Sequence, residues 1–292
     1  MFLRAHAKIN LSLDVLRRRE DGYHEVKMVM QMTGMYDRMN LMPLKGRPGI
    51  RLSTNLPYIP ADENNLAYKA AKLLMDEFEV TDGLEIRLDK FIPVAAGLAG
   101  GSSDAAQALI GVNRLFGLGL DTAELMKRAA RIGADVPYCV MGGTALSEGI
   151  GEVLTPLPSM PDNVCILLCK PNINVSTREV YTALRVDQLD FHPDVDAQTE
   201  ALRAGDIRGI TAKGVMYNVL ETVTGEKYPV IKSIENDMLE AGALAAIMSG
   251  SGPTVFGIFD NADRAEVCRN SLRRTRPSAR TFLTWPAGGE KV

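Results

Sequence analysis

The residues best suited to bind a ligand form a glycine-rich segment at residues 93–106, PVAAGLAGGSSDAA. It lies between a predicted strand at residues 84–88 and a helix that we expect to begin near Ser102. Glycine lets the backbone approach a ligand closely, and a helix N-terminus offers unpaired N–H groups and partial positive charge. The segment therefore favours binding of an anion, usually a phosphate. A turn whose serines cap the helix is the simpler alternative, but the glycine content exceeds what a cap requires.

Two familiar phosphate-binding patterns do not fit this segment. It lacks the lysine of GxxxxGK[ST], and the spacing of Gly97, Gly100 and Gly101 does not match GxGxxG. The sequence therefore predicts a phosphate-binding loop of a third kind.

A second glycine-serine segment, SGSGPT at residues 249–254, joins two apolar runs in the C-terminal half. Alone it could be a hairpin turn, although it is longer and richer in glycine than a tight hairpin requires. Two such loops from separate domains could enclose one polyphosphate. The spacing leaves open whether they meet.

Two charged residues are candidates for catalytic roles. Lys8 lies in a run at residues 3–15 that alternates apolar and polar residues, which predicts a strand with one buried face and places Asn10 beside the lysine. Asp135 follows a predicted helix end at Gly133. Singly, a lysine on a polar strand face is usually solvated, and such an aspartate usually caps the next element. Neither residue alone indicates catalysis.

The composition is that of a globular protein. The chain has 292 residues, 46% hydrophobic and 24% charged, with a formal net charge of −3; this length suggests two domains. The charge argues against nucleic acid or a membrane surface as the main partner. No apolar run approaches the ~20 residues of a membrane span. Arg4 and Lys8 interrupt the first apolar residues, so we expect no signal peptide and a cytoplasmic protein. Four cysteines without C-x-x-C spacing are expected to be reduced thiols.

Hydrophobic periodicity predicts an α+β protein with domains at residues 1–158 and 159–292, divided at the proline-rich run 156–161. In the first domain we expect strands at 3–15, 26–34, 50–54 and 84–90, a charged turn at 17–22, helices at 65–78 and 102–116, a helix with an Asp121–Glu124 capping box that Gly133 ends, and strands between 142 and 154. In the second we expect a strand at 164–169, ill-defined helices between 177 and 223, a helix at 229–241, strands at 243–248 and 254–259, a helix at 262–274 and a strand at 280–285. The extra helices aside, the second domain follows a βαββαβ order.

Together these segments resemble the GHMP kinases, small-molecule kinases named for galactokinase, homoserine kinase, mevalonate kinase and phosphomevalonate kinase. The resemblance runs nearly end to end. Its carriers are AKINLSLDVLRRREDGYHE (7–25), ENNLAYKAAKLL (63–74), PVAAGLAGGSSDAAQAL (93–109), IGADVPYCVMGGTAL (132–146) and MSGSGPTVFG (248–257). The second loop is typical of the superfamily. The combination of AKINL, DGYHE and GADVP is much more specific and resembles one branch, whose substrate carries a cytidine diphosphate.

The resemblance implies a role for each candidate residue. The catalytic pair would be Lys8 and Asp135, with Asp135 accepting the proton of the substrate hydroxyl. ATP would be bound by Asn65, near the adenine, and around its phosphates by Pro93, Val94, Ala95, Ala96, Gly97, Leu98, Ala99, Gly100, Gly101, Ser102 and Ser103. The substrate would be held by Asn10, Tyr23 and His24, with Tyr181 stacking on the cytosine. The shared cleft would be lined by Ser249, Gly250, Ser251 and Gly252.

The resemblance also implies a fold and a reaction. The fold would combine an N-terminal domain like ribosomal protein S5 domain 2 with a C-terminal ferredoxin-like domain. The reaction would be ATP-dependent phosphorylation of the 2-hydroxyl of a cytidine diphosphate sugar alcohol, giving the 2-phosphate and ADP in non-mevalonate isoprenoid biosynthesis. The cofactors would be ATP and Mg²⁺; no metal-binding motif is present, although Ser102 or Ser103 could contact the ion. The partner would be this small molecule, not nucleic acid or membrane, and the protein a monomer or homodimer.

Two alternatives stay open. One is another GHMP kinase acting on homoserine or a mevalonate-like alcohol. The other is a non-catalytic nucleotide sensor, which would be expected to lose the aspartate or the lysine. Three positions depart from the usual family pattern: Ile150 replaces a frequent arginine, Val219 a common aspartate, and Met30 an aromatic residue of some relatives. These departures bear on the substrate pocket rather than on the reaction class.

Overall fold

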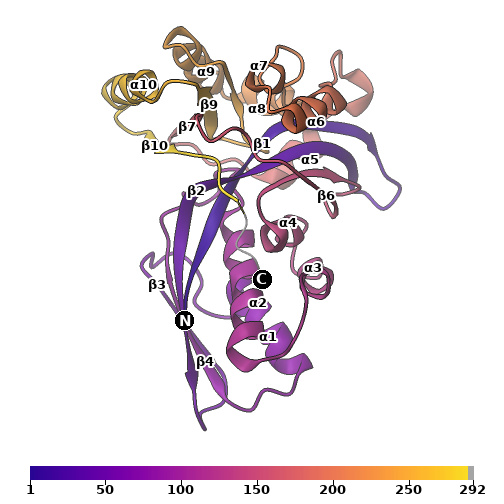
Figure 1. The fold of residues 1–292 in the computed structure, drawn as a ribbon, viewed down its shortest axis with the longest axis vertical. Coiled ribbons are helices and arrows are strands. Elements are labelled where there is room, and N and C mark those ends of the chain that lie inside the picture. The colour runs from indigo at the N-terminus through magenta and orange to yellow at the C-terminus, as the bar shows by residue number, and fades with distance from the viewer. Residues whose placement is uncertain (289–292) are drawn as a thin grey trace.

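The computed structural model describes residues 1–288, which form two β-sheets with helices packed on them (Figure 1). The first sheet contains β1 (Phe2–Arg18), β2 (His24–Leu44), β3 (Ile50–Thr54), β4 (Gly83–Asp89), β5 (Thr144–Glu148) and β6 (Val153–Leu157). Its order is β3-β4-β2-β5-β6, and β1 pairs with β2 over almost the whole length of both strands. The helices of this part are α1 (Leu66–Glu77), α2 (Gly100–Phe116), α3 (Thr122–Ala129) and α4 (Val136–Met141).

The second sheet is antiparallel, with the order β10-β7-β9-β8. Its strands are β7 (Cys165–Lys170), β8 (Ala245–Met248), β9 (Val255–Phe259) and β10 (Arg280–Thr284). The helices are α5 (Thr177–Ala183), α6 (Val195–Ala204), α7 (Ile207–Ile210), α8 (Glu221–Lys227), α9 (Val230–Glu240) and α10 (Ala262–Thr275), with a 3₁₀ turn η1 at Val186–Gln188. The predicted α+β class and the βαββαβ order are thus confirmed.

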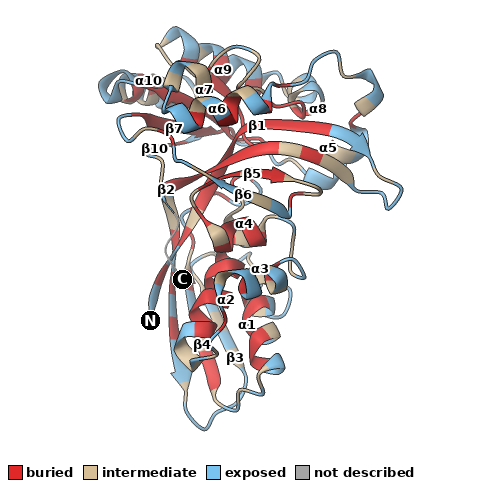
Figure 2. Ribbon diagram, turned by 45° about the vertical axis from the view of Figure 1, so that its right-hand side comes forward, coloured by how far each residue is buried: buried red, intermediate tan, exposed pale blue. Residues whose placement is uncertain are grey.

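The β1–β2 hairpin is the element that both parts share. Ala7, Ile9 and Leu11 of β1 belong to a hydrophobic cluster with Ile166 of β7 and Phe256 of β9. The other side of this stretch of β1 is also covered, and Figure 2 shows the strand buried along most of its length. The prediction of one buried face is therefore wrong here, because this part of the first sheet is covered on both faces, one of them by the second sheet.

One helix boundary differs from the sequence predictions, and one helix was not predicted. The Asp121–Glu124 capping box is confirmed, but α3 ends at Ala129 and not at Gly133, which has no positive φ. The short helix α4 was not predicted, because six residues that include Pro137 carry too little periodicity to mark a helix. Its presence places Asp135 at a helix N-cap.

Other features of the chain bear on its organisation. The predicted domain division between residues 158 and 159 falls in the connection between β6, which ends at Leu157, and β7, which begins at Cys165. The β1–β2 hairpin of the first sheet also packs against the second sheet. The division into two domains is therefore a proposal. All four cysteines are buried and free, as expected. In residues 1–288, no helix is long and apolar enough to cross a membrane.

Candidate active site

The two glycine-rich loops meet at the wall of one cleft of about 970 Å³. This volume lies at the upper end of the range for small-molecule sites. The predicted residues that line the cleft are Lys8, Asn10, Tyr23, His24, Asn65, Pro93 to Ser102, Asp135, Tyr181, Gly250 and Ser251. Three others, Ser103, Ser249 and Gly252, are buried and do not line it. Residues that the sequence analysis did not single out also line it, among them Arg18, Lys90, Asp104 and Arg178.

The first glycine loop has the backbone geometry of an anion-binding site. Ala95, Gly97 and Ala99 all have left-handed φ values, of 50°, 74° and 54°, and such alternating conformations turn successive N–H groups towards one concavity. Strained conformations at two alanines are typical of functional loops. The helix behind the loop, α2, has Ala99 at its N-cap and no side-chain cap. The alternative in which a serine caps this helix is therefore wrong, and the first-turn N–H groups of α2 have no side-chain cap to compete with an anion.

Direct contacts hold the two loops together. The Ser249 hydroxyl donates to the Gly97 carbonyl oxygen at 3.0 Å, and the Thr254 N–H donates to the Ala96 carbonyl at 3.4 Å. Strand β1 joins the same assembly, because the Lys8 N–H donates to the Leu98 carbonyl at 3.1 Å. One cleft wall thus combines main-chain segments that lie more than 150 residues apart.

The close approach at Gly97 leads to a testable prediction. A Cβ atom at Gly97 would lie 2.1 Å from the Ser249 carbonyl oxygen, and its φ is 74°. Gly97→Ala must therefore push the loops apart and strain the backbone. We expect the KM for ATP to rise by roughly tenfold or more, since a disturbance of 1.4 kcal/mol is a factor of ten. Steady-state kinetics with ATP as the varied substrate measures this.

Gly117→Ala is a matched control for this substitution. Gly117 has a similar φ of 64°, but nothing lies within 4 Å of a Cβ placed there. This variant should lose some stability and keep its KM for ATP. If both variants change that KM equally, the contact between the loops is not what the nucleotide requires.

Lys8 and Asp135 face each other across the cleft floor. Their Nζ and Oδ2 atoms are 3.8 Å apart, and the lysine also donates to Asn10 Oδ1 at 2.7 Å. Lys8 is almost completely buried, whereas the Asp135 side chain keeps 34% of its exposure. Asp135 occupies the N-cap of α4 but makes no side-chain cap hydrogen bond. The capping role is therefore wrong for this aspartate, and its carboxylate is available to a molecule in the cleft.

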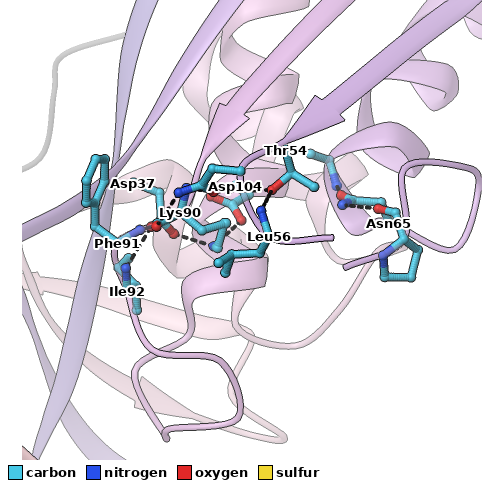
Figure 3. Close-up of polar contacts among 11 residues, drawn as sticks. Asp37, Thr54, Leu56, Asn65, Lys90, Phe91, Ile92 and Asp104 are labelled. Atoms are coloured by element: carbon cyan, nitrogen blue, oxygen red, sulfur yellow. Dashed lines mark hydrogen bonds and ion pairs between the residues drawn. The ribbon is translucent and has the colours of Figure 1, made fainter. Parts of the chain in front are cut away.

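The side chain of Asn65 makes hydrogen bonds to two backbone groups near the cleft. Its side-chain oxygen accepts from the Ala67 N–H at 2.9 Å, and its amide donates to the Pro60 carbonyl at 2.9 Å (Figure 3). It thereby caps α1 and anchors the segment of Tyr58 and Ile59, which also line the cleft. These two bonds leave one N–H and one oxygen lone pair of the side chain unused, and Asn65 lines the cleft, so it could both position this segment and contact an adenine.

A buried cluster of charges, which we name the base cluster, lies beneath the first loop and consists of Asp37, Lys90 and Asp104 (Figure 3). Lys90 Nζ contacts both carboxylates, and Asp37 Oδ1 also accepts from the backbone N–H groups of Phe91 and Ile92. The cluster thus ties the entry of the loop to the N-terminal part of α2. Burial raises the pKa of Asp104 to about 8, more than the Lys90 ammonium lowers it.

Sequence reasoning missed this cluster. Asp37, Lys90 and Asp104 lie up to 67 positions apart, on a strand, after a strand and in a helix. The one available signal was an acidic Asp104 among the small residues near the start of this helix.

The rings of His24 and Tyr181 form another cleft wall. Their centroids are 5.3 Å apart and the rings are tilted by 44°, so a base stacked between them would require them to separate. Burial, and to a lesser degree Arg18, lowers the pKa of His24, which favours a neutral imidazole able to donate and accept. Burial raises the pKa of Tyr181, which keeps its phenol protonated. Tyr23 lines the cleft from the hairpin turn with 60% of its surface exposed.

Comparison with known families and proteins points to one group of kinases. The family models "GHMP kinases N terminal domain" and "GHMP kinases C terminal" match residues 65–143 and 199–277. A 4-diphosphocytidyl-2-C-methyl-D-erythritol kinase from Lachnospira eligens is 52% identical over 97% of this chain and 96% of its own. The kinase of that name from Alkaliphilus oremlandii is 53% identical over 99% of this chain and 98% of its own.

Solved structures give the same grouping. A 4-(cytidine 5'-diphospho)-2C-methyl-D-erythritol kinase superposes with a TM-score of 0.83 at 34% identity, covering 99% of this chain and 100% of its own. A homoserine kinase from Cytophaga hutchinsonii superposes with a TM-score of 0.79 at 19% identity, covering 99% of this chain and 96% of its own. The second likeness concerns the fold alone.

Proposed function

The chain belongs to the GHMP kinases, within them to the 4-diphosphocytidyl-2-C-methyl-D-erythritol kinases, and we propose that it phosphorylates the 2-hydroxyl of that compound with ATP. The products are ADP and the 2-phosphate, and the reaction belongs to non-mevalonate isoprenoid precursor biosynthesis. The observation that carries the proposal is the Lys8–Asp135 pair, which faces the same cleft as a loop of left-handed residues at a helix N-terminus.

The glycine loop and α2 are suited to the non-transferred phosphates of ATP. Main-chain N–H groups and the positive end of the 17-residue helix α2 stabilise negative charge without a lysine in the loop. The adenine then lies towards the segment that Asn65 anchors, beside Tyr58 and Ile59. This places the γ-phosphate towards Lys8 and Asp135.

Asp135 receives the proton of the substrate hydroxyl while the new O–P bond forms and the bond from the γ-phosphorus to the ADP oxygen breaks. Phosphoryl transfer depends mainly on positioning and charge stabilisation, so a carboxylate with a low intrinsic basicity suffices to orient the hydroxyl. Lys8, fixed by Asn10 at 2.7 Å, stabilises negative charge on the attacking oxygen. Tyr23, His24 and Tyr181 hold the cytidine end of the substrate.

Mg²⁺ fits this site as an ion that arrives with ATP. In residues 1–288, no cluster of three His, Cys, Asp or Glu side chains is arranged to hold a metal, and Mg²⁺ commonly uses phosphates, waters and only one or two protein oxygens. Ser102 lines the cleft, whereas the Ser103 hydroxyl is buried without a partner and does not line it. Ser102 is therefore the better candidate to contact the ion. When bound, Mg²⁺ neutralises charge on the phosphates.

The setting of the enzyme follows from the same proposal. We place it in the cytoplasm, where its four free cysteines stay reduced. Its partner is the small-molecule substrate, with no role for nucleic acid, and it acts as a monomer or a homodimer.

A coupled ADP-release assay tests the proposed function. With Mg-ATP, the purified chain should turn over 4-diphosphocytidyl-2-C-methyl-D-erythritol and show no comparable rate with homoserine or mevalonate. A faster rate with either of these would assign another activity of the same superfamily. Nucleotide binding without turnover of any of them would instead identify a sensor.

A further inference from the structure

Two of the cations that line the cleft have no anionic partner. Among the described residues, the lysine and arginine side chains that line it are Lys8, Arg18, Lys90 and Arg178. Lys8 is held by Asp135 and Asn10, and Lys90 by the base cluster. The guanidinium groups of Arg18 and Arg178 make no ion pair or side-chain hydrogen bond within residues 1–288. Both side chains are exposed to the cleft and free to bind an anion.

The fold brings these two arginines to the same wall from different elements. Arg18 ends β1 and pairs in register with His24 at the start of β2. Arg178 lies in α5, three positions before Tyr181, and residues with this spacing share a helix face. The His24 and Tyr181 rings contact each other at 5.3 Å. The arginines therefore flank the ring pair, Arg18 from the hairpin and Arg178 from α5.

Thr177, the neighbour of Arg178, connects α5 to the second glycine loop. The Thr177 and Ser251 hydroxyls are 2.7 Å apart, and Ser251 lies in the second glycine loop, which contacts the first at Gly97. Arg178 thus lines the cleft next to a residue that contacts the second glycine loop and one helical turn from Tyr181. A diphosphate that joins a base at the rings to an alcohol at Lys8 and Asp135 would pass this position.

On the premise of the proposed function, we propose that Arg178 and Arg18 bind the diphosphate of the cytidine substrate and set the preference of the enzyme for it. Guanidinium groups bind phosphate oxygens through two parallel N–H donors, with a geometry that an ammonium lacks. The ATP phosphates are bound by main-chain amides of the first glycine loop in the proposed function, so the two anionic ligands do not compete for the same donors. The arginines are specificity-determining residues and take no part in the chemical step.

Kinetics of Arg178→Gln, Arg18→Gln and the double variant test the proposal. A hydrogen bond to a charged group contributes enough for its loss to raise KM by about 10- to 100-fold. We expect such a rise for the cytidine substrate in Arg178→Gln, a smaller one in Arg18→Gln, and unchanged kcat and KM for ATP. Arg178→Lys should recover only part of the loss, because it restores charge without the forked geometry. Arg185→Gln, also exposed but not lining the cleft, is the control for loss of one positive charge.

Comparing the binding of CDP with that of cytidine in the same variants isolates the contribution of the diphosphate to affinity. By calorimetry, the unmodified chain should bind CDP more tightly than cytidine, and the double variant should lose most of that difference while its affinity for cytidine stays the same. If the double variant keeps its KM for the cytidine substrate and its affinity for CDP, the proposal is overturned. A rise in the KM for ATP alone, or an equal rise in the KM for the cytidine substrate in Arg185→Gln, overturns it as well. An unmodified chain that fails to turn over the cytidine substrate refutes the proposed function instead, so the two failures are distinguishable.

Discussion

Replacing Asp135 with asparagine is expected to lower kcat by roughly 10²- to 10⁴-fold, the range that a positioned proton acceptor contributes. The amide keeps the shape of the side chain but neither accepts the hydroxyl proton nor pairs with the Lys8 ammonium, which lies 3.8 Å from the carboxylate. The amide oxygen can still accept a hydrogen bond from the substrate hydroxyl, but the proton then has no acceptor as the O–P bond forms. Single-turnover measurements of ADP formation report this change in the chemical step.

The variant should leave nucleotide binding and folding nearly intact. The Asp135 side chain makes no cap hydrogen bond to α4, so its replacement removes no contact that the helix needs. Asp162→Asn, at an exposed position outside the cleft, is the matched control and should keep full activity. Near-normal turnover of Asp135→Asn would show that another group accepts the proton.

The sequence pointed to Lys8 and Asp135 as the proposed catalytic pair only through resemblance, and the structure explains why. In a single strand, Lys8 is a charge on a polar face, and nothing in its neighbours reveals that this face is covered. The cover comes from residues far away in the sequence, including Leu98 and Asp135, which contact Lys8, and Gly250, which lies beside Asn10. Periodicity reports how a segment is divided between apolar and polar faces, but not whether the polar face is solvated. It therefore located β1 and could not place Lys8 in a cleft.

Local signals were reliable where local physics decides the structure. The Asp121–Glu124 capping box and the strand pair around the second glycine loop formed as predicted, and the helix predicted at 65–78 is observed as α1 at Leu66–Glu77. The base cluster is the opposite case. Asp37, Lys90 and Asp104 converge only when β2, β4 and α2 pack together, and none of the three has a local pattern that distinguishes it from a surface charge.

Lys90→Met is expected to lower the free energy of unfolding by about 3–5 kcal/mol, because removing one partner of a buried ion pair leaves uncompensated charge. Asp37 and Asp104 would then face each other in the interior without a cation. Since Asp37 also accepts from the N–H groups of Phe91 and Ile92, the entry of the first glycine loop should shift and the KM for ATP should rise. Urea-induced unfolding monitored by circular dichroism gives the first quantity, and steady-state kinetics the second.

Lys72→Met is the matched control, since Lys72 pairs with Asp76 at 2.7 Å but the two side chains keep 52% and 63% of their exposure. Exposed pairs of this kind are screened by water and salt, so this variant should unfold almost like the unmodified chain. Equal unfolding of Lys90→Met and Lys72→Met would mean that the base cluster does not stabilise the fold.

The pH dependence of stability gives an independent measure of the base cluster. Burial raises the pKa of Asp104 from 3.8 in its unperturbed state to about 8. Between these two values the folded chain binds more protons at this site than the unfolded chain, so the contribution of Asp104 to stability falls as the pH rises from about 4 to 8. Asp104→Asn carries no proton to lose and keeps a neutral side chain beside Lys90 at every pH. The stability of this variant relative to the unmodified chain should therefore increase steadily between pH 5 and pH 8.5, and a constant difference would mean that Asp104 is already ionised when buried.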